Sequence, residues 1–116
     1  MVCEMHTIDT KTIIVNLLKE DKKTYLSVRR LQKLLIYIYE ELSKTNEIER
    51  YQVYFDINFD AIERTVLYNS HIFKLDIDGE IIYLREKESA DSLARKYRTD
   101  DKIKMIINDF ITLSAA

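Results

Sequence analysis

The chain has 116 residues, of which 47% are hydrophobic and 33% charged, so we expect one globular domain over residues 1–116 rather than a disordered segment. A formal net charge of −2, a single glycine and no proline exclude a global basic field for nucleic acid, glycine-rich phosphate loops and proline-rich linkers. A single cysteine excludes an internal disulfide, and no apolar run approaches the ~20 residues of a membrane span.

The first residues predict a solvated tail. The N-terminal segment MVCEMHTIDTK lacks the apolar core of a signal peptide, and together with the single cysteine this indicates a cytoplasmic protein. Cys3 and His6 supply two metal ligands, whereas a structural zinc site uses four. We therefore expect residues 1–8 to be frayed, and we expect neither a metal nor a cofactor.

Two amphipathic helices are predicted next. Asp9 or Thr10 can cap a helix that runs to about Lys19. Its narrow apolar stripe consists of Ile13, Ile14, Leu17 and Leu18. Ser27 can cap a second helix over residues 28–44, in which apolar residues recur at alternating spacings of three and four. The wider stripe of this helix, typical of a core helix, consists of Val28, Leu31, Leu34, Leu35, Ile38, Tyr39 and Leu42.

Residues 45–57 fit two structures. Asn46 followed by Glu49 resembles a capping box, which predicts a short helix over residues 47–53. Apolar and polar residues instead alternate over residues 51–57, which is the period of a half-buried strand that could join the sheet of the following hairpin. The capping box favours the helix by a small margin, and the sequence leaves both alternatives open.

Residues 58–84 predict a short helix that leads directly into a β-hairpin. Asn58 or Asp56 can cap the helix, which is expected to run to about Tyr68. The residues expected to point inward are Phe59, Ile62 and Val66. A hairpin is marginal by itself, so we expect its apolar face to pack on the helices.

Asp78-Gly79 marks the tip of the hairpin. This pair is the two-residue loop that a type I′ turn prefers, because both central residues need a positive φ. The strands would then be 72–77 and 80–84, with Phe73 opposite Leu84, Leu75 opposite Ile82 and Ile77 opposite Glu80. One face is then apolar, with Phe73, Leu75, Ile77, Ile82 and Leu84, and the other carries Lys74, Asp76, Ile81 and Tyr83.

Residues 89–113 predict a helical extension at the C-terminus. Ser89 can cap a short helix over residues 90–97, and Thr99 or Asp100 can cap a final helix. The final helix has a strongly apolar stripe, which can either dock on its own domain or pair with a second copy of the chain. The candidate interface residues are Ile106, Phe110 and Leu113.

No catalytic signature is present in the sequence. Nucleophilic catalysis needs a nucleophile beside a base, but the only cysteine, Cys3, is in the tail, and the only histidines are His6 and His71. His71 lies between the helix and the hairpin, where a structural histidine is the commoner outcome. We therefore expect a protein that is not an enzyme.

The stretch IERTVLYNSHIFKLDIDGEIIYL resembles the recognition helix and wing of a winged helix-turn-helix domain of bacterial and phage regulators, and the resemblance covers residues 28–84. It implies a winged-helix-like three-helix core with the antiparallel hairpin. Together with the N- and C-terminal helices predicted outside residues 28–84, this gives an α+β fold that is mostly helical. It also implies a homodimeric, DNA-binding protein of transcription regulation, whose helix enters the major groove of duplex DNA and whose hairpin lies on the backbone.

The resemblance places candidate nucleic-acid contacts in three segments. These are Arg64, Thr65 and Tyr68 on the recognition helix, Lys74 on the hairpin, and Arg29, Arg30 and Lys33 at the start of the long helix. The recognition helix has one cation against Asp60 and Glu63, and the four-residue spacing of Asp60 and Arg64 also fits an ion pair. Affinity for DNA depends largely on the neutralisation of phosphates by cations. A recognition helix with one cation and two acidic residues therefore departs from the family.

The alternative hypothesis is a protein-protein interaction module, or a phage or mobile-element accessory protein, on the same fold without DNA binding. Its support is the net charge of −2, the eight tyrosines and the apolar final helix. The tyrosines count because this residue type is favoured at protein interfaces. The segment VRRLQKLLIYIYEEL is also similar to a helix of the SocA-like, phage-associated antitoxin family, although that family's Tyr-Gly-Pro segment is absent.

Overall fold

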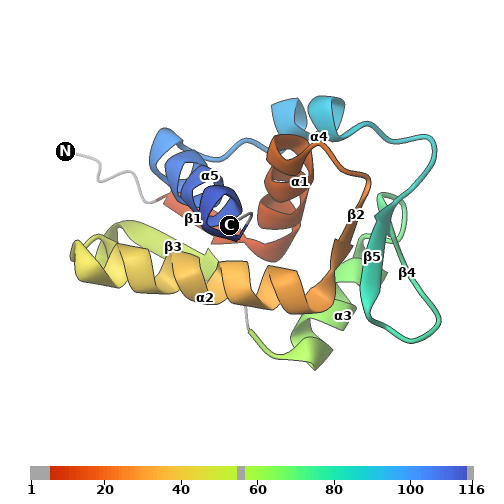
Figure 1. Ribbon diagram of the computed structural model, residues 1–116, viewed down its shortest axis with the longest axis horizontal. Helices are drawn as coiled ribbons and strands as arrows, with labels where there is room; N and C mark the ends of the chain where they lie inside the picture. The colour runs from red at the N-terminus through yellow and green to blue at the C-terminus, as the bar shows by residue number, and fades with distance from the viewer. Residues whose placement is uncertain (1–5, 55–56, 115–116) are drawn as a thin grey trace.

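The computed structural model describes residues 6–54 and 57–114 and shows an α+β fold that is mostly helical (Figure 1). In chain order the elements are β1 (His6–Asp9), α1 (Thr10–Asp21), β2 (Tyr25–Ser27), α2 (Val28–Lys44), η1 (Ile48–Arg50), β3 (Tyr51–Tyr54), α3 (Phe59–Tyr68), β4 (Phe73–Leu75), β5 (Ile81–Leu84), α4 (Ala90–Lys96) and α5 (Asp101–Ser114). None of the helices in these ranges is long and apolar enough to cross a membrane.

Helix α1 is the centre of the fold. It contacts α3, α4 and α5, and its buried residues are Thr10, Thr12, Ile13, Ile14, Val15, Asn16, Leu17 and Leu18. The four residues predicted for its apolar stripe are buried, but the buried surface is not narrow, because neighbours pack on this helix from several sides. The predicted cap is confirmed: the Asp9 carboxylate accepts a hydrogen bond from the Thr12 backbone N–H at 2.7 Å.

Helices α2 and α5 pack on each other, and α5 also contacts α1. The bounds predicted for α2 are confirmed, and its cap Ser27 accepts a hydrogen bond from the Arg30 N–H at 3.0 Å. Tyr39 was expected in the buried stripe of α2, but its side chain is 49% exposed. Helix α5 is capped by Asp100, whose carboxylate accepts from the Ile103 N–H at 2.9 Å.

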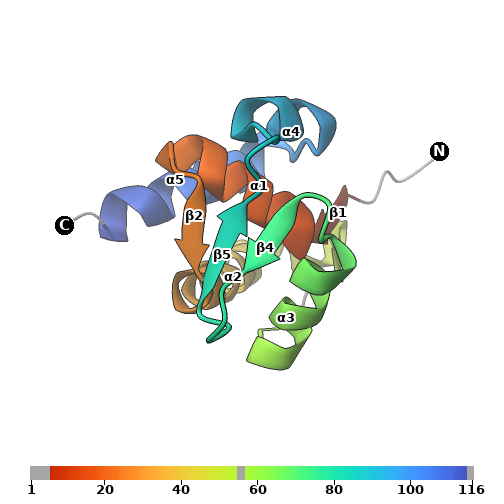
Figure 2. The same ribbon diagram turned by 90° about the vertical axis from the view of Figure 1, so that its right-hand side faces the viewer.

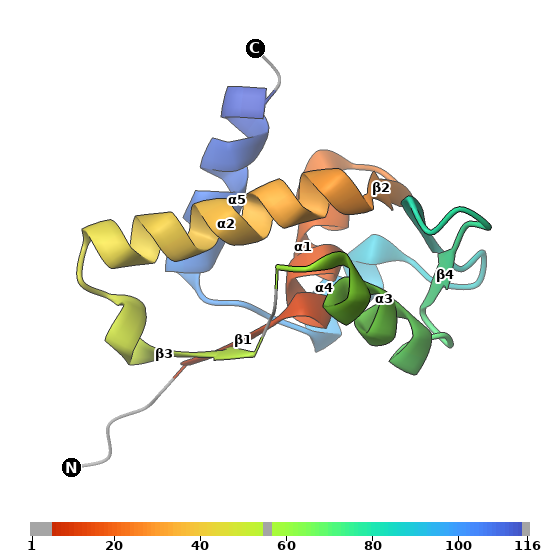
Figure 3. The same cartoon turned by 90° about the horizontal axis from the view of Figure 1, so that it is seen from below.

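Residues 45–57, for which the sequence left a helix and a strand open, contain a strand rather than the slightly favoured helix over residues 47–53. Among the described residues of this segment only 48–50 form a helical turn, and β3 then pairs in parallel with β1, with Ile8 opposite Val53. This pair lies away from the hairpin (Figure 3), so β3 is not the third strand of the hairpin sheet. The expected fraying of residues 1–8 is wrong from His6 onward, because Ile8 is 2% exposed. Cys3, Phe55 and Asp56 lie outside the described residues.

The hairpin sheet has three antiparallel strands in the order β2-β5-β4. The predicted register is confirmed for two of the three pairs, because Phe73 lies opposite Leu84 and Leu75 opposite Ile82. The strands are shorter than the predicted 72–77 and 80–84, so Ile77 and Glu80 lie in the turn and not in a strand pair. The edge strand β2, which the sequence did not predict, pairs with β5 so that Tyr25 lies opposite Tyr83. Phe73 and Ile82 are fully buried, so one face of the sheet closes the core and the other faces outward.

The turn of the hairpin differs from the prediction. The Gly79 N–H donates to the Asp76 carbonyl at 3.1 Å, and the Asp76 carboxylate accepts from the N–H groups of Glu80 (2.8 Å) and Ile81 (3.1 Å). Gly79 has φ +71, but Asp78 has no positive φ, so the turn is not type I′. The side chain of Asp76, not Asp78, shapes the turn. Ile77, expected on the apolar face, is fully exposed at the tip.

The short helix α4 completes the core on the other side of α1. The Asn16 side chain, which is 1% exposed, donates to the Thr12 carbonyl at 2.8 Å and to the Tyr97 carbonyl at 2.9 Å. This contact fixes the end of α4 to the middle of α1. Over the described residues one hydrophobic cluster runs from Ile8 to Phe110 and positions both α3 and the three-stranded sheet.

Candidate interaction surfaces on α3, α2 and the sheet

Helix α3 presents a mixed acidic and apolar surface. Its cap is confirmed, because the Asn58 side chain accepts from the Ala61 N–H at 2.8 Å, and Ile62 and Val66 are buried as predicted. Phe59 is 49% exposed rather than inward, because it lies at the first position of the helix, beside a small hollow instead of over the core. The exposed residues of α3 are Phe59, Asp60, Glu63, Arg64, Leu67 and Tyr68.

The three candidate contacts on α3 have different environments. Arg64 is exposed and Tyr68 is 83% exposed, so both can reach a partner. Thr65 is half-buried, and its hydroxyl donates to the Ala61 carbonyl within the helix at 3.1 Å. Over the described part of the chain no ion pair joins Asp60 to Arg64, although their spacing allows one.

The candidate contacts on α2 gather near the end of α5. Arg29, Arg30 and Lys33 line a hollow of about 490 Å³ together with Lys23 and Phe110. Arg30 forms a close ion pair with the Asp21 carboxylate at 2.5 Å, whereas Arg29 and Lys33 are exposed. A carboxylate therefore already neutralises one of the cations at the start of α2.

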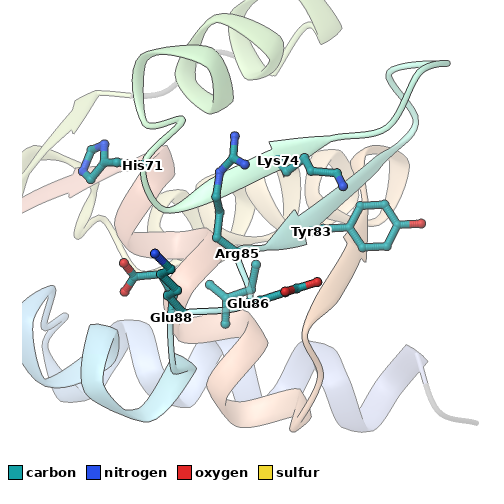
Figure 4. A pocket seen from close by; sticks show the side chains of 8 residues that line it. His71, Lys74, Tyr83, Arg85, Glu86 and Glu88 are labelled. Atoms are coloured by element: carbon teal, nitrogen blue, oxygen red, sulfur yellow. The ribbon is translucent and has the colours of Figure 1, made fainter.

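Lys74 lies on the outward face of the three-stranded sheet, directly opposite Tyr83. Both side chains line a hollow of about 540 Å³, whose other labelled residues are His71, Arg85, Glu86 and Glu88 (Figure 4). Arg85 is held in place by a hydrogen bond from its Nε to the Ser70 carbonyl at 2.6 Å. The candidate nucleic-acid contacts are thus distributed over α3, the start of α2 and the sheet.

The candidate interface residues of α5 have different exposures. Ile106 and Phe110 are 4% and 8% exposed, and the Phe110 ring centroid lies 5.8 Å from that of Tyr37 on α2. Leu113 is 64% exposed. The apolar stripe of α5 therefore packs mainly inside its own chain, and only its last turn remains available to a second molecule.

The groups whose pKa is clearly shifted lie around α5, away from α3. Burial, followed by the hydrogen bond to Asp100 at 2.9 Å, raises the pKa of Tyr51 far above its usual range. Burial, with Glu41 next, raises the pKa of Tyr37 to about 12. Within residues 6–54 and 57–114, no group of three His, Cys, Asp or Glu side chains is arranged to hold a metal ion.

The sequence did not identify the aromatic pair formed by Tyr25 and Tyr83. Their ring centroids are 6.4 Å apart on the outward face of the sheet. The period-two alternation placed Tyr83 and Lys74 on one face, but β2 is only three residues long, which is too short for a periodic signal.

Comparison of the chain with family models, with curated proteins and with solved structures gives no match in any of the three.

Proposed function

We propose that this protein is a non-enzymatic interaction module that binds a partner protein through the exposed face of α3. The observation that carries the proposal is the exposure of three large side chains on one short helix: Phe59 (49%), Leu67 (57%) and Tyr68 (83%). Single exposed apolar residues are normal, but several on one element indicate a binding surface. Aromatic residues in particular are enriched at the centres of protein interfaces.

The scaffold that we propose for this module is winged-helix-like. Its support is the order α1, β2, α2, α3, β4, β5, together with the strand order β2-β5-β4. This core differs from the one expected over residues 28–84, because it includes α1 in place of the helix expected over residues 47–53. In such a scaffold α3 and the hairpin lie side by side, as they do in Figure 2. The connection from α2 to α3 departs from a tight helix-turn-helix, because residues 45–58 include η1 and β3.

The charges around α3 favour a partner with a basic, partly apolar surface. Asp60 and Glu63 flank the exposed aromatic residues of α3, and Arg64 is the one cation of the helix. The nearby hairpin turn adds Asp76 and Asp78. Carboxylates repel a phosphate backbone but complement lysine and arginine side chains, and such complementarity steers association.

A photo-cross-linker at the centre of this face tests the proposal. We would replace Tyr68 with p-benzoylphenylalanine in the full chain, irradiate the native host cells and analyse the covalent adducts. Replacement of Tyr39, which is 49% exposed on α2, provides the matched control. We expect a discrete, protease-sensitive adduct at Tyr68 that is absent at Tyr39.

Two results of this experiment would contradict a protein partner on α3. One is the same set of adducts at both positions, which would indicate nonspecific contact. The other is an adduct at Tyr68 that nucleases remove and proteases do not, which would favour the second function below. An adduct with the mass of two chains would identify the partner as a second copy of this protein.

The second candidate function is regulation by binding duplex DNA, with α3 in the major groove. The observation that favours it is that Arg64 and Tyr68 are exposed on α3 while Arg29 and Lys33 are exposed at the start of α2. In winged-helix proteins a groove-facing helix is combined with backbone contacts from neighbouring elements. Lys74 and the ion-paired Arg30 would contribute less, because they lie on the sheet and beside Asp21.

A fluorescence anisotropy titration with random-sequence duplex DNA at two salt concentrations tests this second function. Binding through about four phosphates gives a slope of log affinity against log salt near −3.6. We expect Arg64→Ala to weaken binding if α3 enters the groove. Loss of binding in Arg29→Ala/Lys33→Ala with no effect of Arg64→Ala would contradict that placement, and no binding at low salt would exclude the function.

A further inference from the structure

The outward face of the three-stranded sheet carries an exposed aromatic pair. Tyr25 on β2 and Tyr83 on β5 lie directly opposite each other, with ring centroids 6.4 Å apart and ring planes inclined by 40°. Their side chains are 51% and 40% exposed. Figure 2 shows this face toward the viewer with α1 and α2 behind it, so these two helices cover its opposite side.

Cations surround the two rings. Lys74 on β4 lies opposite Tyr83 on β5. The three facing residues across the sheet, from β2 through β5 to β4, are therefore Tyr25, Tyr83 and Lys74. The Lys23 Nζ lies 6.0 Å from the centroid of the Tyr25 ring. Arg85 follows Tyr83 by two residues and lines the hollow of Figure 4, while its Nε donates to the Ser70 carbonyl. Positive side chains therefore flank both tyrosines.

Two hollows adjoin the strands that carry this aromatic pair: Tyr83 lines one of them, and Ser27 of β2 lines the other. Beyond β2 is the hollow of about 490 Å³, whose lining has four cations, Lys23, Arg29, Arg30 and Lys33, against the single acid Asp21. Beyond β5 is the hollow of about 540 Å³, whose lining has three cations, Lys74, Arg85 and Lys87, against the acids Glu86 and Glu88. The linings of the two hollows are thus together net positive, although the Asp21 carboxylate pairs with Arg30 and Lys23 and the whole chain is negative by 2.

We propose that the outward face of the sheet binds a short single-stranded nucleic acid, with successive bases stacked on Tyr25 and Tyr83 and phosphates held by the cations of the two hollows. Aromatic rings on a sheet, flanked by a positively charged track, provide the two interactions that single strands need. A duplex cannot use the rings, because its bases are already stacked. This surface is separate from the exposed face of α3.

The cross-strand pairing of aromatic residues also stabilises a sheet, but this role does not require the cations. Sheet stabilisation alone predicts that the tyrosines contribute to folding and to nothing else. The proposal predicts in addition that ligand affinity depends on the rings, on the cations, and on the ligand being single-stranded. These dependences are measurable separately from stability.

The test is a fluorescence anisotropy titration of the full chain with a labelled oligothymidylate of about 12 nucleotides at about 50 mM and about 200 mM salt. We expect Tyr25→Ala and Tyr83→Ala each to weaken binding about 5- to 150-fold, the range measured for loss of one stacked base. Tyr25→Phe and Tyr83→Phe keep the rings and are expected to keep most of the affinity. Lys74→Gln/Arg85→Gln should weaken binding and reduce the salt slope by about 1.4.

Controls separate the stacking of bases on the two tyrosines from a general attraction between the protein's cations and any polyanion. Tyr39→Ala removes a tyrosine of similar exposure on α2 and is expected to leave affinity unchanged. Far-UV circular dichroism establishes that each variant is folded. The proposal is overturned if the oligothymidylate does not bind at low salt, if folded Tyr25→Ala and Tyr83→Ala bind normally, or if duplex DNA and heparin bind equally well and insensitively to the tyrosines. None of these results would alter the cross-linking expected at Tyr68.

Discussion

Asp76 and Asp78 show how a single residue determines the conformation of a turn. The dipeptide Asp78-Gly79 is a strong hairpin signal, and it correctly predicted the register of the two strands. However, the Asp76 side chain accepts two backbone hydrogen bonds, from Glu80 and Ile81. An aspartate that bonds the backbone in this way stabilises the turn itself, and the sequence offers no sign of which aspartate does so.

Alanine at each aspartate tests this assignment. We expect Asp76→Ala to lower the free energy of unfolding by about 1–2 kcal/mol, because two backbone donors lose a charged acceptor. Asp78→Ala, the matched control at an exposed position, should change it by less than about 0.5 kcal/mol. Urea unfolding measures both. Equal losses in the two variants would mean that net charge, and not the Asp76 contacts, stabilises the turn.

At the scale of elements, the sequence predicted the helices well and the sheets poorly. Each helix that contains a clear capping side chain, such as Ser27 or Asn58, was located to within a few residues, because caps are local contacts between neighbours in sequence. The pairing of β1 with β3 joins segments more than forty residues apart, and no local pattern encodes it. For the same reason the Tyr25–Tyr83 pair, the main feature of the sheet surface, became visible only in three dimensions.

The placement of β1 in the core and of Ile77 at the hairpin tip can be tested by mutation, because the sequence predicted the wrong environment for Ile8 and for Ile77. Ile8 on β1 was expected in a frayed tail but is 2% exposed, and Ile77 was expected on the apolar face but is fully exposed. We expect Ile8→Ala to lower the free energy of unfolding by about 2–4 kcal/mol through lost burial and a residual cavity. Ile77→Ala should lie within about 0.5 kcal/mol of the parent protein. Similar values for both would contradict the docking of β1 in the core.

The whole molecule is held together at one end by a contact between β3 and the start of α5. Tyr51, 8% exposed, donates its hydroxyl to the Asp100 carboxylate at 2.9 Å, and Asp100 also caps α5 through the Ile103 N–H. Glu47, next to η1, forms an ion pair with Lys102 of α5 at 3.2 Å. These contacts join the N-terminal parallel pair to the C-terminal helix, so the loss of one of them affects global unfolding.

This contact makes stability depend on alkaline pH. Burial and then the Asp100 hydrogen bond raise the pKa of Tyr51 above the value of about 10 for an unfolded tyrosine. A raised pKa means that the stabilisation is complete below about pH 10 and is lost as the pH rises from there through the folded-state pKa. Tyr37, with its pKa raised to about 12, adds to the same decline. We therefore expect the free energy of unfolding to fall above about pH 10.

Tyr51→Phe separates this contribution from general alkaline denaturation. At neutral pH the variant should be less stable by about 1–2 kcal/mol, because the hydrogen bond to a carboxylate is lost. Above pH 10 its stability should decline less steeply than that of the parent protein, because phenylalanine has no proton to release. Tyr39→Phe, at a half-exposed position, is the matched control and should follow the parent profile. Urea unfolding from pH 7 to pH 11 measures all three proteins, and a Tyr51→Phe curve parallel to the parent curve would show that Tyr51 ionisation does not contribute to the decline.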